Sequence, residues 1–536
     1  MKHLYSFLLS ALVCLSLSAQ NKVSGDSLAA DFHYLVKQLE AAHPDPYTGF
    51  GGKVFFHKQA FDLENELRSQ PHTLQEFWDK SMAFLSFIQD GHTYLFSLAP
   101  KQQQEQSYLP VGFRCIPDGL IVQSLPAAHQ DLLGSLLIGI NGKSMDELLA
   151  RTASLFACEN LYNRYSVFCR NVVRRQFMQQ LLPDLEDTVC FYLRTPDGKD
   201  VTLEQHFMEN EELRKAEKVN LPSWVGCPEE QMAYRFIDKK KEVMMFKVNS
   251  IMARDNFEYM YKHMKGDLLR QMEFYYQNAL KKEMPADTLQ AIRALPSFSG
   301  TFAAMLKEMK KHHSEYLIID LRGNSGGWTP IVLASLYQLY GDKYLQKDMD
   351  TEYYRIVSPL YMNKLEITLE EFNRRYGTDY SFGDYTFSMK EQEDIPLDTL
   401  RRQFIDGCMS SVKEELRAQK GAPVYAPKQV FVVTDERTFS AAFHYAFMLW
   451  KMGATVVGVP SGQAPNTFME QTLFKLPYTG IEGSISNSVQ IFLPGKDKRA
   501  KTFWPDVMLT YDEYKQTGFD KQAEILFLLN KIGQEK

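Results

Sequence analysis

The stretch QVFVVTDERTFSAAFHYAFMLW, residues 429–450, decides the fold of this chain. It opens with the apolar, β-branched run 430–433, which predicts a buried strand. A polar turn follows at residues 434–437, and the apolar pattern of residues 441–451 predicts a helix. Ser440 therefore stands at a helix N-terminus, where backbone N–H groups have no partner within the helix.

A serine at such a place has two readings. Developing negative charge is stabilised by donors already aimed at it, so the hydroxyl of Ser440 is a candidate nucleophile. Serine is also among the most frequent N-cap residues, and a cap needs no chemistry. The rest of the chain has to distinguish these two roles.

The composition is that of a globular protein. With 536 residues, the chain is long enough for two or three domains. Its formal charge of −6 and the lack of a long basic run argue against a nucleic-acid-binding surface. The histidines are dispersed and no H-E-x-x-H motif occurs, so we expect neither a metal nor another cofactor.

The N-terminus predicts export. Residues 1–19 have a basic start, an apolar run too short to span a bilayer, and small residues at a cleavage site near Ala19. We therefore expect a signal peptide, no membrane span, and a periplasmic or extracellular protein. Six cysteines remain without C-x-x-C spacing, which favours buried thiols and leaves one or two disulfides open.

Residues 20–104 are predicted to form a helical region with two helices. The second helix ends at Asp90-Gly91-His92-Thr93, because Gly91 is a helix stop. His92 thus stands on a turn and not on an apolar helix face. Most histidines on turns are simply solvated, so His92 needs a partner before it can be given a chemical role.

Residues 105–235 change to short strands. Strands are expected at 109–114, 120–124, 136–140, 189–194 and 200–203, with hairpin turns such as Asn141-Gly142 between them. The series GLIVQSL…LLGSLLIGINGKSMDELL resembles a PDZ domain, with a helical insertion at 163–182. PDZ domains bind extended chain ends by adding a strand to a sheet edge.

Residues 236–536 show an α/β pattern. Strands are predicted at 243–248 and 316–321, and helices at 257–284, 302–312 and 330–340. Residues 344–428 form an insertion. The loop RGNSGG, residues 322–327, joins a strand to a helix, and its glycines let the backbone approach a ligand closely. It fits neither nucleotide-binding glycine motif.

Three separated pieces now carry a resemblance: LIIDLRGNSGG (317–327), TFSAA (438–442) and FIQDGHTYL (87–95). Together they resemble the C-terminal-processing, or tail-specific, serine proteases, in the branch typified by the tricorn protease core. The resemblance extends over residues 33–509. It implies an α/β fold with an N-terminal helical region, a PDZ-like β-rich module and a crotonase- or ClpP-like peptidase core.

The resemblance also implies roles for individual residues. Ser440 would be the nucleophile and His92 the general base, since an imidazole titrates near neutral pH. Backbone N–H groups of Gly326, Gly327 and Ala441 would form the oxyanion hole. His444, one helical turn after Ser440, is an alternative base, although we expect it to serve packing.

The sequence departs from the family pattern in two ways. The tail-specific branch uses a lysine as the base, but after Lys451 the next lysine is Lys475, so that serine–lysine pair is not expected. In the tricorn-like branch a serine precedes the histidine and a glutamate helps to orient it. Here Gly91 precedes His92, and the candidate orienting acids are Asp90, Glu482 and Asp506.

The sequence thus predicts an exported serine peptidase that cuts peptides or unfolded proteins through an acyl-enzyme. The PDZ-like module could select free C-termini. One alternative is a catalytically impaired relative that binds peptides or a small apolar ligand, motivated by the missing orienting acid. Another is acyl transfer on a crotonase-like core.

Overall fold

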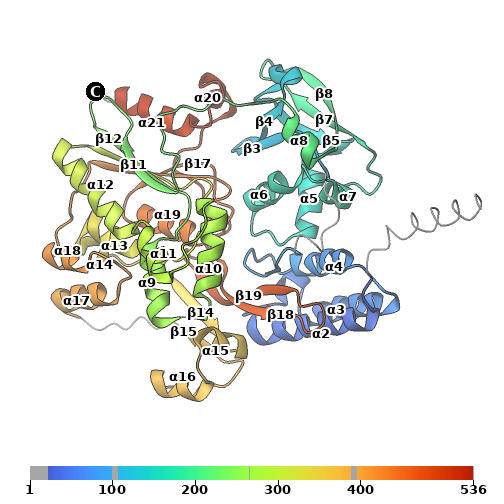
Figure 1. The fold of residues 1–536 in the computed structure, drawn as a ribbon, viewed down its shortest axis with the longest axis horizontal. Coiled ribbons are helices and arrows are strands. Elements are labelled where there is room, and N and C mark those ends of the chain that lie inside the picture. The colour runs from blue at the N-terminus through green and yellow to red at the C-terminus, as the bar shows by residue number, and fades with distance from the viewer. Residues whose placement is uncertain (1–21, 99–106, 265, 350, 388–394, 535–536) are drawn as a thin grey trace, which may run out of the picture.

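The computed structural model describes residues 22–98, 107–264, 266–349, 351–387 and 395–534. The predicted signal peptide, residues 1–19, lies outside these residues. The described chain has three parts: a helical N-terminal region, a β-rich module and an α/β core (Figure 1). The last helix, residues 523–534, lies far from the N-terminal helices, yet the hairpin of residues 467–491 reaches from the core to these helices (Figure 1).

The N-terminal region contains three long helices: α2 (Gly25–Ala42), α3 (Lys53–Ser69) and α4 (Leu74–Ser86), with the short η1 (Thr48–Phe50). The sequence predicted two helices. The second is divided because Pro71 cannot continue a helix, and Thr73 begins α4 with a capping box to Glu76. The apolar faces pack into one core around Phe32 and Phe77. The chain leaves α4 directly into the turn that carries His92.

The β-rich module is a sheet of order β10-β4-β5-β7-β8, with β3 paired to β4 and β6 to β5. Its strands are β3 (Gly112–Ile116), β4 (Gly119–Pro126), β5 (Leu136–Ile140), β6 (Lys143–Ser144), β7 (Thr188–Arg194), β8 (Asp200–His206) and β10 (Lys218–Asn220). Its helical elements are η3 (Ala127–Leu132), α5 (Met145–Leu155), α6 (Leu161–Asn171), α7 (Arg175–Leu181) and α8 (Asn210–Lys215). A separate pair joins β2 (Ser107–Tyr108) to β9 (Met208–Glu209). Helices α6 and α7 occupy the predicted insertion.

The central sheet of the core has the order β11-β12-β13-β16-β17. Its strands are β11 (Met232–Phe236), β12 (Val243–Val248), β13 (Tyr316–Asp320), β16 (Gln429–Thr434) and β17 (Thr455–Gly458). The last four are parallel, and β13 and β16 are neighbours. Carboxyl ends of parallel strands meet at one edge of a sheet, which is where α/β proteins build their sites. This register brings the glycine loop after β13 beside the turn that carries Ser440.

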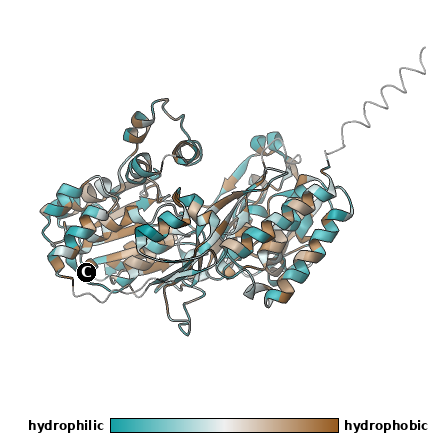
Figure 2. Ribbon diagram, turned by 90° about the horizontal axis from the view of Figure 1, so that it is seen from below, coloured by the Kyte–Doolittle hydropathy of each residue, from teal (hydrophilic) through white to brown (hydrophobic). Residues whose placement is uncertain are grey.

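Alternate residues of the central sheet face opposite layers. Phe246, Ile319 and Val432 pack against α12 (Phe298–His312), α13 (Pro330–Tyr340) and α19 (Ala441–Lys451). The other face packs against α20 (Tyr511–Gln516) and α21 (Ala523–Gln534). Hydrophobic residues accordingly gather on the strands and on the helix faces turned toward them (Figure 2).

The remaining helices of the core lie around this sheet. They are α9 (Arg254–His263), α10 (Leu268–Phe274), the π-helical turn η4 (Tyr275–Leu280), α11 (Thr288–Ala294) and α14 (Asp342–Leu345). The single helix predicted over residues 257–284 is therefore three shorter elements. Gly266 lies at the interruption, where its backbone entropy disfavours a continuous helix.

A second sheet connects the core to the N-terminal region, in the order β1-β19-β14-β15 with β18 paired to β19. Its strands are β1 (Tyr94–Leu95), β14 (Glu352–Ile356), β15 (Tyr385–Phe387), β18 (Thr467–Lys475) and β19 (Glu482–Ile491). The insertion adds α15 (Pro359–Leu365), α16 (Leu369–Tyr376), α17 (Leu397–Gly407) and α18 (Lys413–Ala418). Because Tyr94 pairs with Ser484, the turn holding His92 is fixed against a strand of the core.

Two sequence expectations concern thiols and membranes. The six cysteines that the structure describes are free, and four of them are buried, as the scattered spacing favoured. Within the described ranges, no helix combines the length and apolar character that crossing a bilayer requires.

Candidate active site

Ser440 occupies a backbone conformation that a side chain rarely adopts. Its φ is 51° and its ψ is −127°, which is the geometry of the first central residue of a type II′ turn and favours glycine. A non-glycine residue there costs roughly 1–3 kcal/mol and persists where the surroundings enforce it, often at functional sites. The Ser440 side chain makes no capping hydrogen bond to α19, so the N-cap reading is wrong.

The turn that carries Ser440 is bound to the glycine loop after β13. The N–H of Gly323 donates to Asp435 Oδ2 at 2.8 Å, and the N–H of Phe439 donates to the Asn324 carbonyl at 3.0 Å. These bonds close the gap between two segments that are distant in the sequence. They hold the serine over the loop before any substrate arrives.

The loop and the helix start provide two free donors. Among the residues that the structure describes, the N–H groups of Gly327 and Ala441 have no hydrogen-bond partner. Gly326 differs from the prediction, because its N–H already donates to Asn324 Oδ1 at 2.9 Å. Gly326 instead lets the loop backbone approach Ser440 closely, because a Cβ on Gly326 would lie 2.7 Å from the Cβ of Ser440. The candidate oxyanion hole is therefore Gly327 and Ala441.

Gln463 is a residue that the sequence analysis missed. Its side chain is fully buried, and its Oε1 accepts the backbone N–H of Ser440. This bond fixes the strained turn and keeps the N–H of Ser440 itself out of the oxyanion hole. Gln463 belongs to the segment after β17 in which no lysine was found, and the missing lysine was the only signal that another polar residue could stand there.

His444 is held by hydrogen bonds on both sides of its ring. Nδ1 lies 2.9 Å from Thr329 Oγ1 and Nε2 lies 2.8 Å from Gln490 Oε1. Burial lowers the pKa of His444 to about 4, although the bond to Gln490 opposes the shift. A ring with both nitrogens engaged fits the packing role expected for it.

His92 is buried and not solvated. It is only 6% exposed, its ring lies 5.0 Å from the Phe439 ring, and its Nδ1 has no hydrogen-bond partner. Burial lowers the pKa of His92, against the charges of Asp90 and Glu470 and a backbone hydrogen bond with Phe468. Within the described residues no hydrogen bond joins His92 to the Oγ of Ser440. Catalytic hydrogen bonds are often long in the absence of substrate and tighten on binding.

Of the three acids that the sequence offered as orienting groups for His92, Asp90 lies beside the histidine. Its Oδ1 accepts the backbone N–H of His92 at 2.9 Å and lies 3.8 Å from Nδ1 of the same residue. Its Oδ2 accepts from Thr93 Oγ1 at 2.5 Å and lies 3.3 Å from Nε2 of His43. Burial would raise the pKa of Asp90, but the His43 bond and charge, with His92 and Thr93, outweigh it and lower the pKa to about 2.

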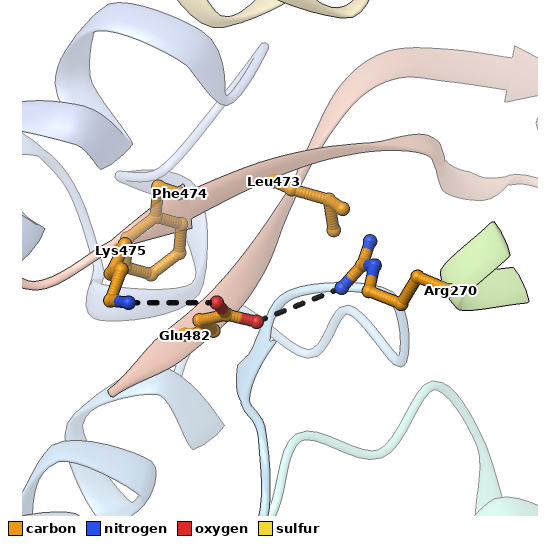
Figure 3. A pocket seen from close by; sticks show the side chains of 5 residues that line it. All are labelled: Arg270, Leu473, Phe474, Lys475 and Glu482. Atoms are coloured by element: carbon orange, nitrogen blue, oxygen red, sulfur yellow. Dashed lines mark ion pairs between the residues drawn. The ribbon is translucent and has the colours of Figure 1, made fainter. Parts of the chain in front are cut away.

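The other two acid candidates are engaged elsewhere. Glu482 forms ion pairs with Arg270 at 3.6 Å and Lys475 at 4.0 Å, in the wall of a surface pocket of about 330 Å³ (Figure 3). Asp506 accepts the backbone N–H of Val456 at 2.8 Å and so fastens β17. These contacts argue against Glu482 and Asp506 as orienting acids for His92.

Glu159, from the β-rich module, is a second residue that the sequence analysis missed. Its Oε1 lies 3.9 Å from Nδ1 of His92. Burial, with the charge of Asp90, raises the pKa of Glu159 to about 8, against hydrogen bonds from the backbone of Ala464 and Gly91. One atom each of Asp90, His92 and Glu159 lie within 4.8 Å of one another, so these three side chains could also hold a divalent cation.

The fold and this site together define a hydrolase with a serine on a strained strand-to-helix turn. Residues 291–482 match the family model of peptidase family S41. This match covers about a third of the chain, and it confirms the resemblance to the C-terminal-processing proteases at the level of the family. No curated protein sequence matches the chain.

The two solved structures of mature CPAF, with TM-scores above 0.5, show the same fold. The superposition on mature CPAF includes 95% of this chain and 98% of the CPAF chain, at 14% sequence identity and a TM-score of 0.55. Mature CPAF complexed with lactacystin covers 94% and 97% at 15% identity, with a TM-score of 0.53. The photosystem II D1 C-terminal processing protease covers 91% and 94% at 11% identity, with a TM-score of 0.38. The predicted α/β class, with its helical N-terminus, β-rich module and peptidase core, is confirmed.

Proposed function

We propose that this chain is an exported serine peptidase that hydrolyses peptide bonds in peptides or unfolded proteins, with Ser440 as nucleophile and His92 as general base. The observation that carries the proposal is the Ser440 turn. Its side chain caps nothing, its backbone is strained, and two N–H groups of the adjoining segments, those of Gly327 and Ala441, have no hydrogen-bond partner among the described residues. A structural serine has no use for this combination.

The reaction follows from these positions. Ser440 Oγ attacks the carbonyl carbon of the scissile bond while its proton passes to the imidazole of His92. The oxyanion is held by the N–H groups of Gly327 and Ala441, each worth about 10²–10³ in rate. Collapse expels the amine, which takes the proton from His92. Water then attacks the ester with His92 again accepting a proton, and the carboxylate product leaves Ser440 free.

His92 is the better base of the two histidines near the turn. Its Nδ1 is free, whereas both ring nitrogens of His444 are engaged. A lowered pKa keeps His92 neutral, and therefore able to accept a proton, at neutral pH. No lysine follows Lys451 before Lys475, and Gln463 binds the turn instead, which favours a tricorn-like site over a serine–lysine pair.

The test is hydrolysis of an unstructured protein and of a fluorogenic peptide library by the chain from residue 20 onward. We expect cleavage by the parent, and loss of it in Ser440→Ala and His92→Ala. His129→Ala, a partly exposed position in the β-rich module, serves as the histidine control. EDTA should leave the rate unchanged, because this chemistry needs no metal. Retained activity in His92→Ala would move the base to another residue.

One observation favours the alternative of a peptide-binding relative: the absence of a Ser440–His92 hydrogen bond among the described residues. The same library decides the matter. If the parent is inert from pH 5 to 9 and Ser440→Ala binds peptides as the parent does, the chain is a binding protein.

A further inference from the structure

One ring nitrogen of His92 is buried without a partner. The residue is 6% exposed, and its Nδ1 has no hydrogen-bond partner among the residues that the structure describes. The hydrogen bond between the ring and the Phe468 backbone is therefore made by Nε2. Because this bond favours the protonated ring, Nε2 donates to the Phe468 carbonyl. A neutral imidazole with its proton on Nε2 carries a lone pair on Nδ1.

This lone pair faces two carboxylates. Nδ1 of His92 lies 3.8 Å from Asp90 Oδ1 and 3.9 Å from Glu159 Oε1, and the three atoms lie within 4.8 Å of one another. All three residues are buried, so water screens them poorly. Three hydrogen-bond acceptors that face one another repel, unless a positive charge lies between them.

Both carboxylates are held in position by other bonds. The partners of Asp90 are the N–H of His92 at 2.9 Å, Thr93 Oγ1 and His43 Nε2. The partners of Glu159 are the N–H groups of Gly91 at 3.2 Å and Ala464 at 2.9 Å, and the side chain of Thr467. A carboxylate offers about four lone pairs, so Asp90 and Glu159 each keep one for a further ligand.

We propose that the carboxylates of Asp90 and Glu159 and Nδ1 of His92 bind a zinc ion, which inhibits the peptidase. Zinc binds imidazole nitrogen and carboxylate oxygen at about 2.0–2.2 Å, and a water molecule completes the tetrahedron in sites with three protein ligands. Its ligand atoms then lie about 3.3–3.6 Å apart. The distances of 3.8 and 3.9 Å need to shorten by only a few tenths of an ångström, and the separation of the carboxylate oxygens, at most 4.8 Å, by somewhat more.

The surroundings of His92 suit a metal ligand. A metal-binding histidine commonly donates its other ring N–H to a backbone carbonyl or a carboxylate, which fixes the tautomer. The bond from Nε2 to Phe468 has this arrangement. Asp90 and His92 come from the turn after α4, whereas Glu159 comes from the β-rich module between α5 and α6. Two carboxylates balance the charge of a divalent ion, so zinc would join the module to the turn without excess charge.

The inhibitory effect follows from the position of the metal, and it rests on the proposed function of His92. Zinc occupies the lone pair of Nδ1, and a coordinated nitrogen cannot accept the proton of Ser440. The metal-free chain is then the active form, and zinc binding reversibly stops hydrolysis.

The first experiment measures binding and needs no turnover. The metal-free mature chain is titrated with ZnCl₂ against a chromophoric chelator, and we expect one equivalent of tightly bound zinc. Glu159→Gln should weaken this binding by at least about 100-fold, because losing a ligand costs more than losing a group that supports one. Glu436→Gln, with the same 8% exposure at Glu436, and His33→Ala, which removes the exposed pair His33–Glu64, should bind zinc as the parent does.

The second experiment measures hydrolysis. ZnCl₂ should inhibit the parent over the concentration range in which it binds, and EDTA should restore the rate. MgCl₂ should leave the rate unchanged, because magnesium prefers oxygen ligands. Each variant is compared with its own metal-free rate, so a low basal rate does not imitate resistance to zinc. Equal zinc binding or equal inhibition in Glu159→Gln and the parent would overturn the inference.

A crystal structure with zinc covers the case in which Glu159→Gln does not fold. Anomalous scattering at the zinc edge should place the ion between Asp90, His92 and Glu159. Zinc bound only at surface pairs such as His33–Glu64 would overturn the inference, and a second proton on His92 would then separate the three acceptors. Failure of the proposed function looks different: the parent would be inert while zinc still binds to the three side chains.

Discussion

The hydroxyl of Ser440 has a proposed chemical role, and the backbone conformation of this residue lowers the stability of the fold. Two substitutions can separate these effects. Both Ser440→Ala and Ser440→Gly remove the hydroxyl, so both should abolish hydrolysis. Only alanine keeps a Cβ at φ 51° and ψ −127°, so the glycine variant should be more stable than the alanine variant, by roughly 1 kcal/mol. Thermal unfolding of the two inactive proteins measures the difference. Equal melting temperatures would show that the turn is relaxed.

Glu159 should also make stability depend on pH. Its pKa is about 8 in the fold against an ordinary 4.5, so between these values the folded chain binds more protons than the unfolded chain. Stability therefore falls as the pH rises through this window, by at most about 1.4 kcal/mol per pH unit. Glu159→Gln lacks this loss, and its advantage over the parent in urea unfolding should grow from pH 5 to pH 8. Exposed Glu204→Gln is the control, and an advantage independent of pH would contradict the assignment.

Two glycines of the loop between β13 and α13, Gly323 and Gly327, differ in how closely other atoms pack against them. A Cβ on Gly327 would meet the Ile251 carbonyl at 2.2 Å, at a φ of 141°. Gly327→Ala should thus displace the oxyanion donor and lower kcat by about 10²–10³. Gly323, at a φ of 77°, has no atom within 4 Å of such a Cβ. Gly323→Ala should cost stability only, so similar kinetics for the two variants would remove Gly327 from the oxyanion hole.

The β-rich module and two segments of the core meet at one buried carboxylate. Glu524 of α21 binds Arg114 of β3 at 2.8 Å and Arg322, beside the glycine loop, at 2.7 Å. Glu524→Gln would leave two buried guanidinium groups short of a partner, so we expect a loss of about 3–5 kcal/mol in the free energy of unfolding, with reduced activity. Denaturant titration measures it. The exposed pair Lys307–Glu415 is the control, and Glu415→Gln should change stability by less than about 1 kcal/mol.

The sequence predicted those features of the structure that depend on residues close together in the chain. The order of strand, turn and helix around Ser440 and the class of the fold follow from periodicity and glycine placement. Gln463 and Glu159 could not be predicted, because each reaches the site through a tertiary contact between distant segments. Gly326 is a different case: Asn324, only two residues earlier, accepts its N–H, and the glycine pattern of the loop does not reveal which N–H groups the loop itself uses.

The assembly of the site from distant segments has a consequence for timing. His92 lies near the start of the chain, Glu159 in the module that follows, and Ser440 and Gln463 close to the end. Ribosomes make the chain from His92 toward Gln463, so a growing chain holds a histidine with no serine to activate. Cleavage can begin only after the last strands have been made and have folded onto the first turn. The order of synthesis therefore delays hydrolysis until the later segments have folded onto the earlier ones.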